Sequence, residues 1–389
     1  MKRIEILSAG VVTLAVLNTS AVAQPNRGAP TGVVAHRNLE YIPKGHESHK
    51  LDIFVPKDAS GSLPLIVWVH GGGWQNGSKD GCPPLRKGYV QRGYAVAAIN
   101  YRLSGHATFP AQIQDCKAAI RWLRANADRY GIDPERIGVW GSSAGGHLVA
   151  LLGTSGDVEE FDVGENLDQS SRVQAVCDYY GPTDFKAFVT TPRYESHASE
   201  TSPEGKLIGG AVLKNEEKAR RVNPIEYVSE DEPPFLIVHG DEDRTVPLNQ
   251  SALLYEALKK AGRDVRFHTI HGAGHGRPGF GAPEIENMVQ KFFDAKLKSK
   301  SVSTPKAVAT ESAVSEADRK AAERGRPNRK RGRITFNQVL SRNDKDKDGK
   351  LSREEFPGGK ALYERMDRNK DGFVTREEHE KTFGPDKGR

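Results

Sequence analysis

A serine framed by glycines is the first group in this sequence with evident chemistry. The run is Gly141-Ser142-Ser143-Ala144-Gly145. A Gly-x-Ser-x-Gly pattern exposes its serine hydroxyl when a strand precedes it and a helix follows it. Residues 136–140 have the pattern of a short strand and 145–152 that of a helix. The sharp turn leaves little room for side chains at its flanks, which accounts for the glycines. The frame predicts Ser143 as a nucleophile and Ser142 as a bystander.

A glycine run upstream offers the hydrogen-bond donors that such a nucleophile needs. His70-Gly71-Gly72-Gly73-Trp74 stands at the end of the apolar run 63–70. Acyl transfer to serine creates an oxyanion, and backbone N–H groups stabilise it if no side chain obstructs them. We therefore expect the N–H groups of Gly72, Gly73 and Ala144 to form an oxyanion hole.

An acid and a base should follow the serine in the order Ser, Asp, His. Asp241, Glu242 and Asp243 come directly after the strand-like residues 234–239. The tight turn in His239-Gly240-x-x-Asp243 favours Asp243, which it places above the sheet edge. Asp241 is the main alternative.

The base is expected in the glycine-rich loop after the last strand. Its sequence is Ile270-His271-Gly272-Ala273-Gly274-His275-Gly276. His275 lies deeper in this loop, between glycines that allow its imidazole to reach back to Ser143, and His271 is the alternative. His70, His147 and His239 are interpreted as structural residues near the turns. Ser143, His275 and Asp243 are then the predicted catalytic triad, and this chemistry needs no metal.

The C-terminal residues carry a second kind of chemistry. Asp344–Glu355 fits the twelve-residue EF-hand calcium loop, and Asp367–Glu378 repeats it 23 residues later. The alternative for this segment is a solvated charged tail. The predicted ligands of two Ca²⁺ ions are Asp344, Asp346, Asp348, Lys350 and Glu355, followed by Asp367, Asn369, Asp371, Phe373 and Glu378. Few apolar residues are available for packing here, so ion binding should supply much of the folding free energy.

Strands and helices alternate over most of the chain. This alternation predicts an α/β fold with a mainly parallel sheet and helices on both faces, here the α/β-hydrolase fold, followed by a small all-α EF-hand module. The expected strands are 50–55, 63–70, 94–101, 136–140, 173–179, 234–239 and 265–269. The expected helices are 111–130, 145–152, 251–261 and 285–296.

The N-terminus has the anatomy of a secretory signal. Lys2 and Arg3 precede an apolar run over 6–17, and Ala21-Val22-Ala23 supplies small residues for cleavage before Gln24. An uncleaved membrane anchor is the alternative, but the run is short for a bilayer span. We expect a secreted or periplasmic protein that is not an integral membrane protein.

Four segments follow from these patterns. They are a signal peptide at 1–23, a hydrolase domain at 31–298, a flexible basic linker at 299–333 and an EF-hand pair at 334–384. Residues 296–333 hold 12 Lys or Arg against 4 Asp or Glu, a net +8, whereas the whole chain carries +6. The basic excess therefore belongs to the linker, and no nucleic-acid partner is expected. Cys82, Cys116 and Cys177 permit at most one disulfide, and no essential one is expected.

With these residues in view, the chain resembles esterases of the hormone-sensitive-lipase and carboxylesterase superfamily. It is most similar to secreted bacterial enzymes grouped as bifunctional feruloyl and acetyl-xylan esterases. The resemblance covers about 34–297 and includes Asn100-Tyr101-Arg102-Leu103, Trp122-Leu123-Arg124 and Gly131-Ile132-Asp133-Pro134-Glu135-Arg136-Ile137. It implies hydrolysis of short acyl esters, either small esters or acylated polysaccharide. Residues 158–202 would form a short polar cap, which argues against large lipid substrates.

Two other functions stay open at this stage. The acid and base segments also resemble prolyl-oligopeptidase-like serine peptidases, although those carry a large N-terminal propeller for which this chain leaves no room. A non-catalytic calcium-dependent adhesion protein is the second alternative. The C-terminal module looks like the compact calcium-binding pairs of secreted bacterial proteins, so a cell surface or matrix is a further candidate partner.

Overall fold

The computed structural model describes residues 28–298 and, towards the C-terminus, 340, 344, 346–353, 355–356, 363, 366–367 and 369–378. The chain divides into two compact units, with the division between residues 303 and 304. The expected signal peptide at 1–23 and the linker at 299–333 lie outside the described residues. Within the described part, no helix combines the length and apolar character needed to span a bilayer.

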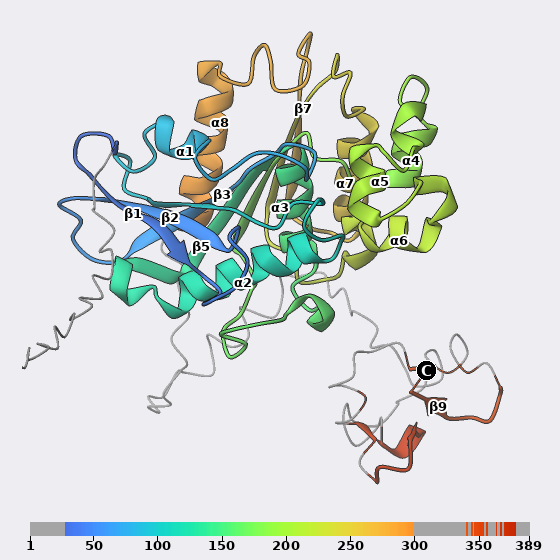
Figure 1. Ribbon diagram of the computed structural model, residues 1–389. Coiled ribbons are helices and arrows are strands. Elements are labelled where there is room, and N and C mark those ends of the chain that lie inside the picture. Colours follow the sequence, from blue (N-terminus) through green and yellow to red (C-terminus); the bar gives the residue numbers. More distant parts are fainter. Residues whose placement is uncertain are drawn as a thin grey trace, which may run out of the picture. The chain divides into compact units, whose positions relative to one another are not determined.

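One eight-stranded sheet forms the centre of the larger unit, in the order β1-β2-β4-β3-β5-β6-β7-β8 (Figure 1). Strands β3 to β8 run parallel, whereas β2 pairs antiparallel with both β1 and β4. This arrangement confirms the expected mainly parallel sheet. The strands are β1 Val33–Glu40, β2 Lys50–Pro56, β3 Leu63–Val69, β4 Ala95–Ile99, β5 Ile132–Ser142, β6 Ala175–Tyr179, β7 Phe235–Gly240 and β8 Val265–Ile270.

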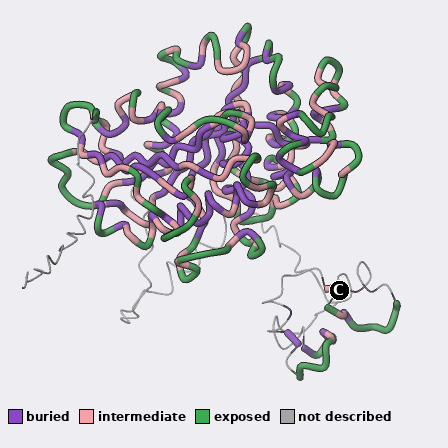
Figure 2. Tube along the Cα trace, in the orientation of Figure 1, coloured by how far each residue is buried: buried purple, intermediate pink, exposed green. Residues whose placement is uncertain are grey.

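Helices cover both faces of this sheet. Apolar residues of α2, α3 and α7 join the core on one face, and those of α8 join the core on the other. Figure 2 shows the consequence, with buried residues concentrated along the strands and exposed residues along the outer loops. The helices are α1 Pro83–Arg86, α2 Ala111–Ala125, α3 Ala144–Thr154, α4 Phe185–Thr190, α5 Pro203–Ile208, α6 Glu216–Arg221, α7 Asn249–Lys260 and α8 Pro283–Phe293. Shorter turns are the 3₁₀ helices η1 Asp128–Tyr130, η2 Glu159–Phe161, η3 Glu195–Ala198, η4 Val212–Lys214 and η5 Pro224–Tyr227, and the π-helical turn η6 Asp294–Lys298.

Burial explains which strands the sequence predicted. Every residue of β4, and all of β3 after Leu63, is buried, and such strands have continuous apolar sequences. The prediction omitted β1, which lies at the edge of the sheet and alternates buried with half-exposed residues. Its pattern is further broken by a bulge between His36 and Leu39.

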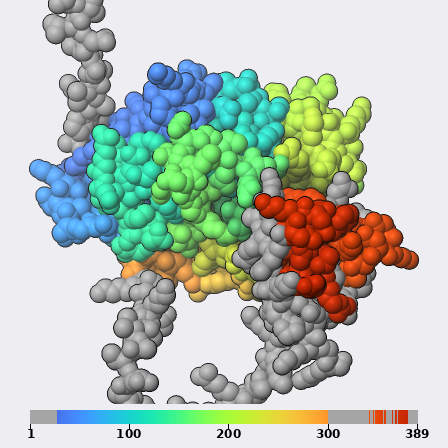
Figure 3. Space-filling view, turned by 90° about the horizontal axis from the view of Figure 1, so that it is seen from below, coloured from blue at the N-terminus to red at the C-terminus, as the bar shows by residue number. Residues whose placement is uncertain are grey.

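The cap differs from the expectation for residues 158–202. The insert that carries α4, α5 and α6 lies between β6 and β7, and these helices gather at one end of the sheet (Figure 1). Residues 158–174 instead precede β6 and pack beside α2. Asp162 there forms ion pairs with the buried cations Lys117 and Arg121 of α2, at 2.6 and 2.5 Å. Figure 3 shows this face, where green atoms of the 150–175 region border the teal atoms of α2.

The smaller unit contains a two-stranded sheet that the all-α expectation did not include. β9, Leu351–Ser352, pairs antiparallel with β10, Phe373–Val374. Leu351 and Val374 pack with Tyr363 and Met366 in a small apolar cluster. The two predicted calcium loops are therefore joined by backbone hydrogen bonds and a shared core.

Candidate active site

The predicted nucleophile occupies the sharp turn between β5 and α3. Ser143 has φ 56° and ψ −125°, a region that non-glycine residues rarely adopt and that is found at functional sites. A side chain at Gly141 would place its Cβ 2.1 Å from the carbonyl oxygen of Gly145. One at Gly145 would lie equally close to the carbonyl oxygen of Val69. The glycines are thus required by backbone crowding at the turn.

The structure brings the three expected triad residues together. His275 Nε2 lies 3.0 Å from Ser143 Oγ, and His275 Nδ1 lies 2.7 Å from Asp243 Oδ2. Since an ionised carboxylate only accepts, Nδ1 carries the proton that is donated to Asp243, and Nε2 is free to accept from Ser143. The ring of Tyr180 packs edge-on against His275, with centroids 4.6 Å apart.

Asp243 is held by more partners than the sequence indicated. The backbone N–H groups of Thr245 and Val246 donate to Oδ1 at 2.7 and 2.9 Å. The fully buried His239 lies 3.3 Å from Oδ2. Burial raises the pKa of Asp243, but hydrogen bonds from His239 and His275 outweigh it and hold this pKa well below its ordinary value. Asp243 is therefore ionised at neutral pH.

His239 was interpreted only as a structural residue, and its contact with the acid was missed. The signal was present in the four-residue spacing of His239 and Asp243 across a Gly turn. His239 Nδ1 contacts Ser251 Oγ at 2.7 Å, and Nε2 contacts the carbonyl oxygen of Val246 at 3.0 Å. These contacts fix the ring of His239 against the loop after β7 that carries Asp243.

The two alternative residues pair with each other instead of with Ser143. His271 Nδ1 lies 2.7 Å from Asp241 Oδ2, and the His271 side chain is 88% exposed. Asp241 also accepts the N–H of Gly272 at 2.7 Å. This pair fastens the turn after β8 to the turn after β7. It thereby helps to position the loop that carries His275.

The glycine run His70–Trp74, called the oxyanion loop below, lies against the sharp turn that carries Ser143, called the elbow below. A Cβ on Gly71 would come within 2.6 Å of the carbonyl oxygen of Ser142, and Gly72 and Gly73 have φ of 111° and 59°. Within the described part of the chain, the backbone N–H groups of Gly72, Gly73 and Ala144 donate to no protein acceptor. Three free donors near a serine hydroxyl are what an oxyanion hole requires.

The loop after β4 supports the oxyanion loop. Tyr101 donates its hydroxyl to the carbonyl oxygen of His70 at 2.9 Å, and the two rings stack with centroids 4.3 Å apart. The N–H of Ser104 donates to the carbonyl oxygen of Trp74 at 2.7 Å. Burial lowers the pKa of His70 to about 4, so this imidazole is neutral at neutral pH. His70 is therefore a packing residue.

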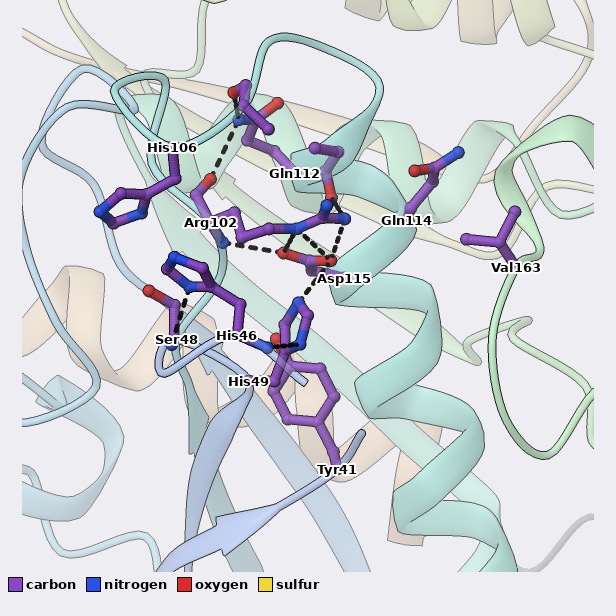
Figure 4. Close-up of polar contacts among 12 residues, drawn as sticks. Tyr41, His46, Ser48, His49, Arg102, His106, Gln112, Gln114, Asp115 and Val163 are labelled. Atoms are coloured by element: carbon purple, nitrogen blue, oxygen red, sulfur yellow. Dashed lines mark hydrogen bonds and ion pairs between the residues drawn. The ribbon is translucent and has the colours of Figure 1, made fainter. Parts of the chain in front are cut away.

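A buried ion pair in turn anchors the loop after β4 (Figure 4). Asp115 of α2 accepts the backbone N–H of Arg102 at 2.8 Å and pairs with its guanidinium at 2.6 Å. His49 Nδ1 accepts the N–H of His46, so its Nε2 donates to Asp115 at 3.1 Å. The motif around Arg102 thus acts by fixing a loop beneath the oxyanion loop.

Two histidines beside this network, the half-buried His46 and the exposed His106, lie close together. The ring centroids of His46 and His106 lie 4.4 Å apart (Figure 4). One nitrogen of each histidine and a carboxylate oxygen of Glu47 lie within 4.8 Å of one another. Each Nδ1 accepts a backbone N–H, from Ser48 and Leu103 respectively. Each Nε2 therefore carries a proton, and the trio is not arranged for metal ligation.

A pocket of about 500 Å³ opens above Ser143. Its walls combine the oxyanion loop and triad with Tyr180, Pro182 and Val246, and with the cap residues His197 and Glu204. The volume suits a small ligand. His197 and Glu204 could not be predicted from the sequence, because residues of the cap show no recognisable motif.

The two C-terminal loops have matching backbone conformations. Lys347 and Gly349 in the first loop have positive φ, as do Lys370 and Gly372 at the same positions of the second. Carboxylate oxygens of Asp344, Asp346 and Asp348 lie within 4.8 Å of one another. Asp344 Oδ1 is buried and has no hydrogen-bond partner in the described part of the chain. Converging oxygens with an unpartnered buried atom fit a hard cation such as Ca²⁺.

Comparisons with known proteins agree with both units. The BD-FAE family model matches residues 51–258, and the EF hand model matches 336–356 and 364–379. Esterase LipC of Mycobacterium tuberculosis is 33% identical over 261 residues, covering 65% of this chain and 64% of that protein. Esterase LipQ of the same organism is 34% identical, covering 58% and 53% respectively. The chain thus spans between about half and two thirds of the length of these relatives.

Solved structures similar to this chain are also esterases. A truncated carbohydrate esterase from gut microbiota has a TM-score of 0.63 at 34% identity, covering 68% of this chain and 96% of that chain. A bifunctional GH43-CE protein of Bacteroides eggerthii has a TM-score of 0.62 at 35% identity, covering 67% and 38%. The resemblance to carboxylesterases and the EF-hand character of the C-terminal residues are confirmed.

Proposed function

Because this chain belongs to the BD-FAE family, we propose that its larger unit is a serine carboxylic-ester hydrolase acting through Ser143, His275 and Asp243. The observation that carries the proposal is the continuous set of contacts from Ser143 Oγ through His275 to Asp243, at 3.0 and 2.7 Å. The relatives named as esterases support the same activity.

The geometry accounts for each step of the reaction. His275 Nε2 takes the hydroxyl proton as Ser143 Oγ attacks the ester carbonyl, and the oxyanion accepts hydrogen bonds from Gly72, Gly73 and Ala144. Collapse of this intermediate releases the alcohol, which takes the proton from His275. Water then hydrolyses the acyl-enzyme by the same route. One oxyanion donor contributes roughly 10²–10³ in rate.

We further propose short acyl esters as substrates, with acetyl or feruloyl groups on polysaccharide. Two similar solved structures carry carbohydrate-esterase titles, one of them joined to a GH43 module. The pocket above Ser143 is about 500 Å³ and has polar residues in its cap wall, which suits a small acyl group on a hydroxylated alcohol better than a lipid.

The decisive experiment compares four substrates with the purified protein. Phenyl acetate, acetylated xylan and methyl ferulate report esterase activity, and a peptide anilide reports the peptidase alternative. Ester turnover that exceeds anilide turnover by several orders of magnitude is the expected result. Turnover of the anilide alone would favour the peptidase, and turnover of none would favour the adhesion protein.

Calcium binding by the C-terminal unit is also a proposal, carried by the unpartnered Asp344 Oδ1 and the two EF-hand loops. A backbone hydrogen bond from Asp348 lowers the pKa of Asp346, but burial and the charges of Asp348 and Glu355 raise it overall. Clustered carboxylates that repel one another are stabilised when a cation binds among them.

We predict that ester hydrolysis does not require calcium. The residues around Ser143 form the reaction centre from the larger unit alone, and they use no metal in the steps above. With excess chelator, kcat/KM on phenyl acetate should change by less than about tenfold, or roughly 1.4 kcal/mol. A larger loss that added calcium restores would show that the two units are coupled.

We predict that calcium orders the C-terminal unit. Its described core consists of four buried side chains with two partly buried ones, which is marginal for a fold without a bound ion. Calorimetry on the full chain should detect two sites, at the roughly 10⁻⁴–10⁻³ M typical of extracellular modules. Hydrogen exchange at Leu351 and Val374 should slow when calcium is added.

The control for this prediction is the pair Glu355→Gln and Glu378→Gln. Each variant removes the glutamate that closes one loop and should lose one of the two sites. Two unaltered sites in both variants, or no binding heat in the parent protein, would leave the segment a charged tail. An exported protein meets enough calcium for such sites, and export remains our proposal for this chain.

A further inference from the structure

One wall of the pocket above Ser143 carries an ion pair that the proposed reaction does not use. His197 of η3 and Glu204 of α5 both line this pocket. His197 Nδ1 lies 2.8 Å from Glu204 Oε2, and the Glu204 side chain is only 4% exposed. Burying a carboxylate costs free energy unless it is paired. Glu204 therefore depends on His197 for its place in the pocket wall, unlike a charged residue on the open surface.

The pair is held rigidly by its neighbours. Phe188 stacks on the His197 ring, with centroids 4.7 Å apart and planes at 28°. Ser202 Oγ donates to the carbonyl oxygen of His197 and accepts the N–H of Gly205, which fixes both η3 and the start of α5. A ring clamped on one face and bonded at Nδ1 has one remaining polar atom, Nε2.

Two polar atoms of the pair are left without protein partners. In the described part of the chain, His197 Nε2 and Glu204 Oε1 make no hydrogen bond, and neither is sealed from solvent. The hydrogen bond that His197 donates to Glu204 raises the pKa of His197, against the opposing effect of burial. With Nδ1–H directed to Glu204, Nε2 donates when the ring is protonated and accepts when it is neutral, and Glu204 Oε1 accepts.

The pair also lies close to the oxyanion loop. A Cβ on Gly73 would meet Pro203 Cβ at 3.2 Å, so the first residue of α5 packs directly against the loop that carries two of the proposed oxyanion donors. Glu204 is the next residue. A ligand seated at Ser143 therefore has this ion pair within the same pocket of about 500 Å³.

From this arrangement we infer that His197 and Glu204 bind a hydroxyl group of the substrate and so determine specificity. His197 Nε2 and Glu204 Oε1 lie on opposite sides of the contact between Nδ1 and Oε2. Since a hydroxyl both donates and accepts, one hydroxyl group of the substrate can bind at Nε2 and another can donate to Oε1. A substrate carboxylate would be repelled by Glu204, whose Oε1 can only accept a hydrogen bond. The hydroxyl belongs either to the sugar that carries the acyl group or to a phenolic acyl group, and the inference rests on the proposed esterase function.

The test compares three substrates. Phenyl acetate has no hydroxyl group, a monoacetylated methyl xyloside has hydroxyls on its alcohol, and methyl ferulate has one on its acyl group. For each variant the measured quantity is the ratio of kcat/KM on a hydroxylated ester to kcat/KM on phenyl acetate. This ratio is insensitive to a uniform loss of active protein.

Asparagine and glutamine at position 197 separate the contact of His197 with the substrate from its contact with Glu204. His197→Asn keeps a donor near Nδ1 for Glu204 but removes the donor at Nε2, whereas His197→Gln places its amide near Nε2. Glu204→Gln removes the charge of the acceptor. Glu195→Gln is the matched control, because Glu195 is an exposed residue of the same 3₁₀ helix and does not line the pocket.

We expect His197→Asn and Glu204→Gln to lower the ratio by about 10- to 100-fold, the range for a hydrogen bond to a charged group. The loss should appear mainly in KM, and His197→Gln should retain more of the ratio than His197→Asn. A fall with the xyloside alone assigns the sugar hydroxyl, and a fall with ferulate alone assigns the phenol. Unchanged ratios in folded His197→Asn and Glu204→Gln proteins would overturn the inference.

The proposed function can fail separately. If the parent protein hydrolyses none of the three esters, the esterase proposal is wrong and the ratios are undefined. If it hydrolyses phenyl acetate and all ratios match that of Glu195→Gln, the esterase proposal stands and only the hydroxyl site is rejected.

Discussion

Ser143→Ala should reduce kcat/KM on phenyl acetate by about 10⁴–10⁶, leaving only the rate that the oxyanion loop and substrate binding support. The loss is this large because Oγ is the atom that forms the acyl bond, and no other hydroxyl lies 3.0 Å from His275 Nε2 in the described part of the chain. Initial rates at several substrate concentrations give the value. The folded state is checked by circular dichroism.

Ser142→Ala is the matched control for this prediction. Ser142 also lines the pocket, but its side chain forms a hydrogen bond with Tyr180. Burial raises the pKa of Tyr180 to about 12, although the hydrogen bond with Ser142 acts to lower it. We expect most of the activity to remain. Similar losses in both folded variants would contradict the assignment of the nucleophile.

Asp243→Asn should lower kcat by about 10⁴ while the protein stays folded. The N–H groups of Thr245 and Val246 both point at Oδ1, so the asparagine must present its carbonyl oxygen to them. Its NH₂ group then faces His275 Nδ1. That contact requires the proton of His275 to sit on Nε2, where the ring can no longer accept the proton of Ser143.

Asp241→Asn is the control for the acid. Asp241 pairs with the exposed His271 outside the pocket, so its loss should cost less than about tenfold in kcat. The pH dependence offers a second measurement. The pKa of Asp243 is held far below its ordinary value, and the parent enzyme should therefore show no fall in activity from this carboxylate between pH 5 and 7. A larger loss in Asp241→Asn than in Asp243→Asn would reverse the two assignments.

Much of the site could be predicted from the sequence, because tight backbone turns require particular residue types at fixed positions along the chain. The elbow needs glycines at fixed distances from Ser143, since its turn brings Gly141 against the backbone of Gly145. Continuous apolar runs predicted the strands that are covered on both faces. The EF-hand loops are equally local, because their ligands are spaced along one short stretch of chain.

The contacts between distant segments could not be predicted in the same way. The choice between His271 and His275 depends on which imidazole reaches across 132 positions to Ser143, and the loop sequence only favoured one. The spacing of His239 and Asp243 is compatible with a contact, but only the folded turn after β7 brings His239 Nε2 to 3.3 Å from Asp243 Oδ2. Edge strand β1 was missed because half-exposed strands carry weak apolar patterns.

The sequence by itself predicted the esterase class, most of the strands in their order along the chain and the two EF-hand loops, since each depends on residues that are close together in the chain. The tertiary structure alone decided the lining of the pocket. His197 and Glu204 come from a cap without a motif, and they line the pocket of Ser143 in a cap whose helix α5 packs against Gly73. The proposed hydroxyl specificity depends on such packing, and packing between segments distant in sequence leaves no local pattern.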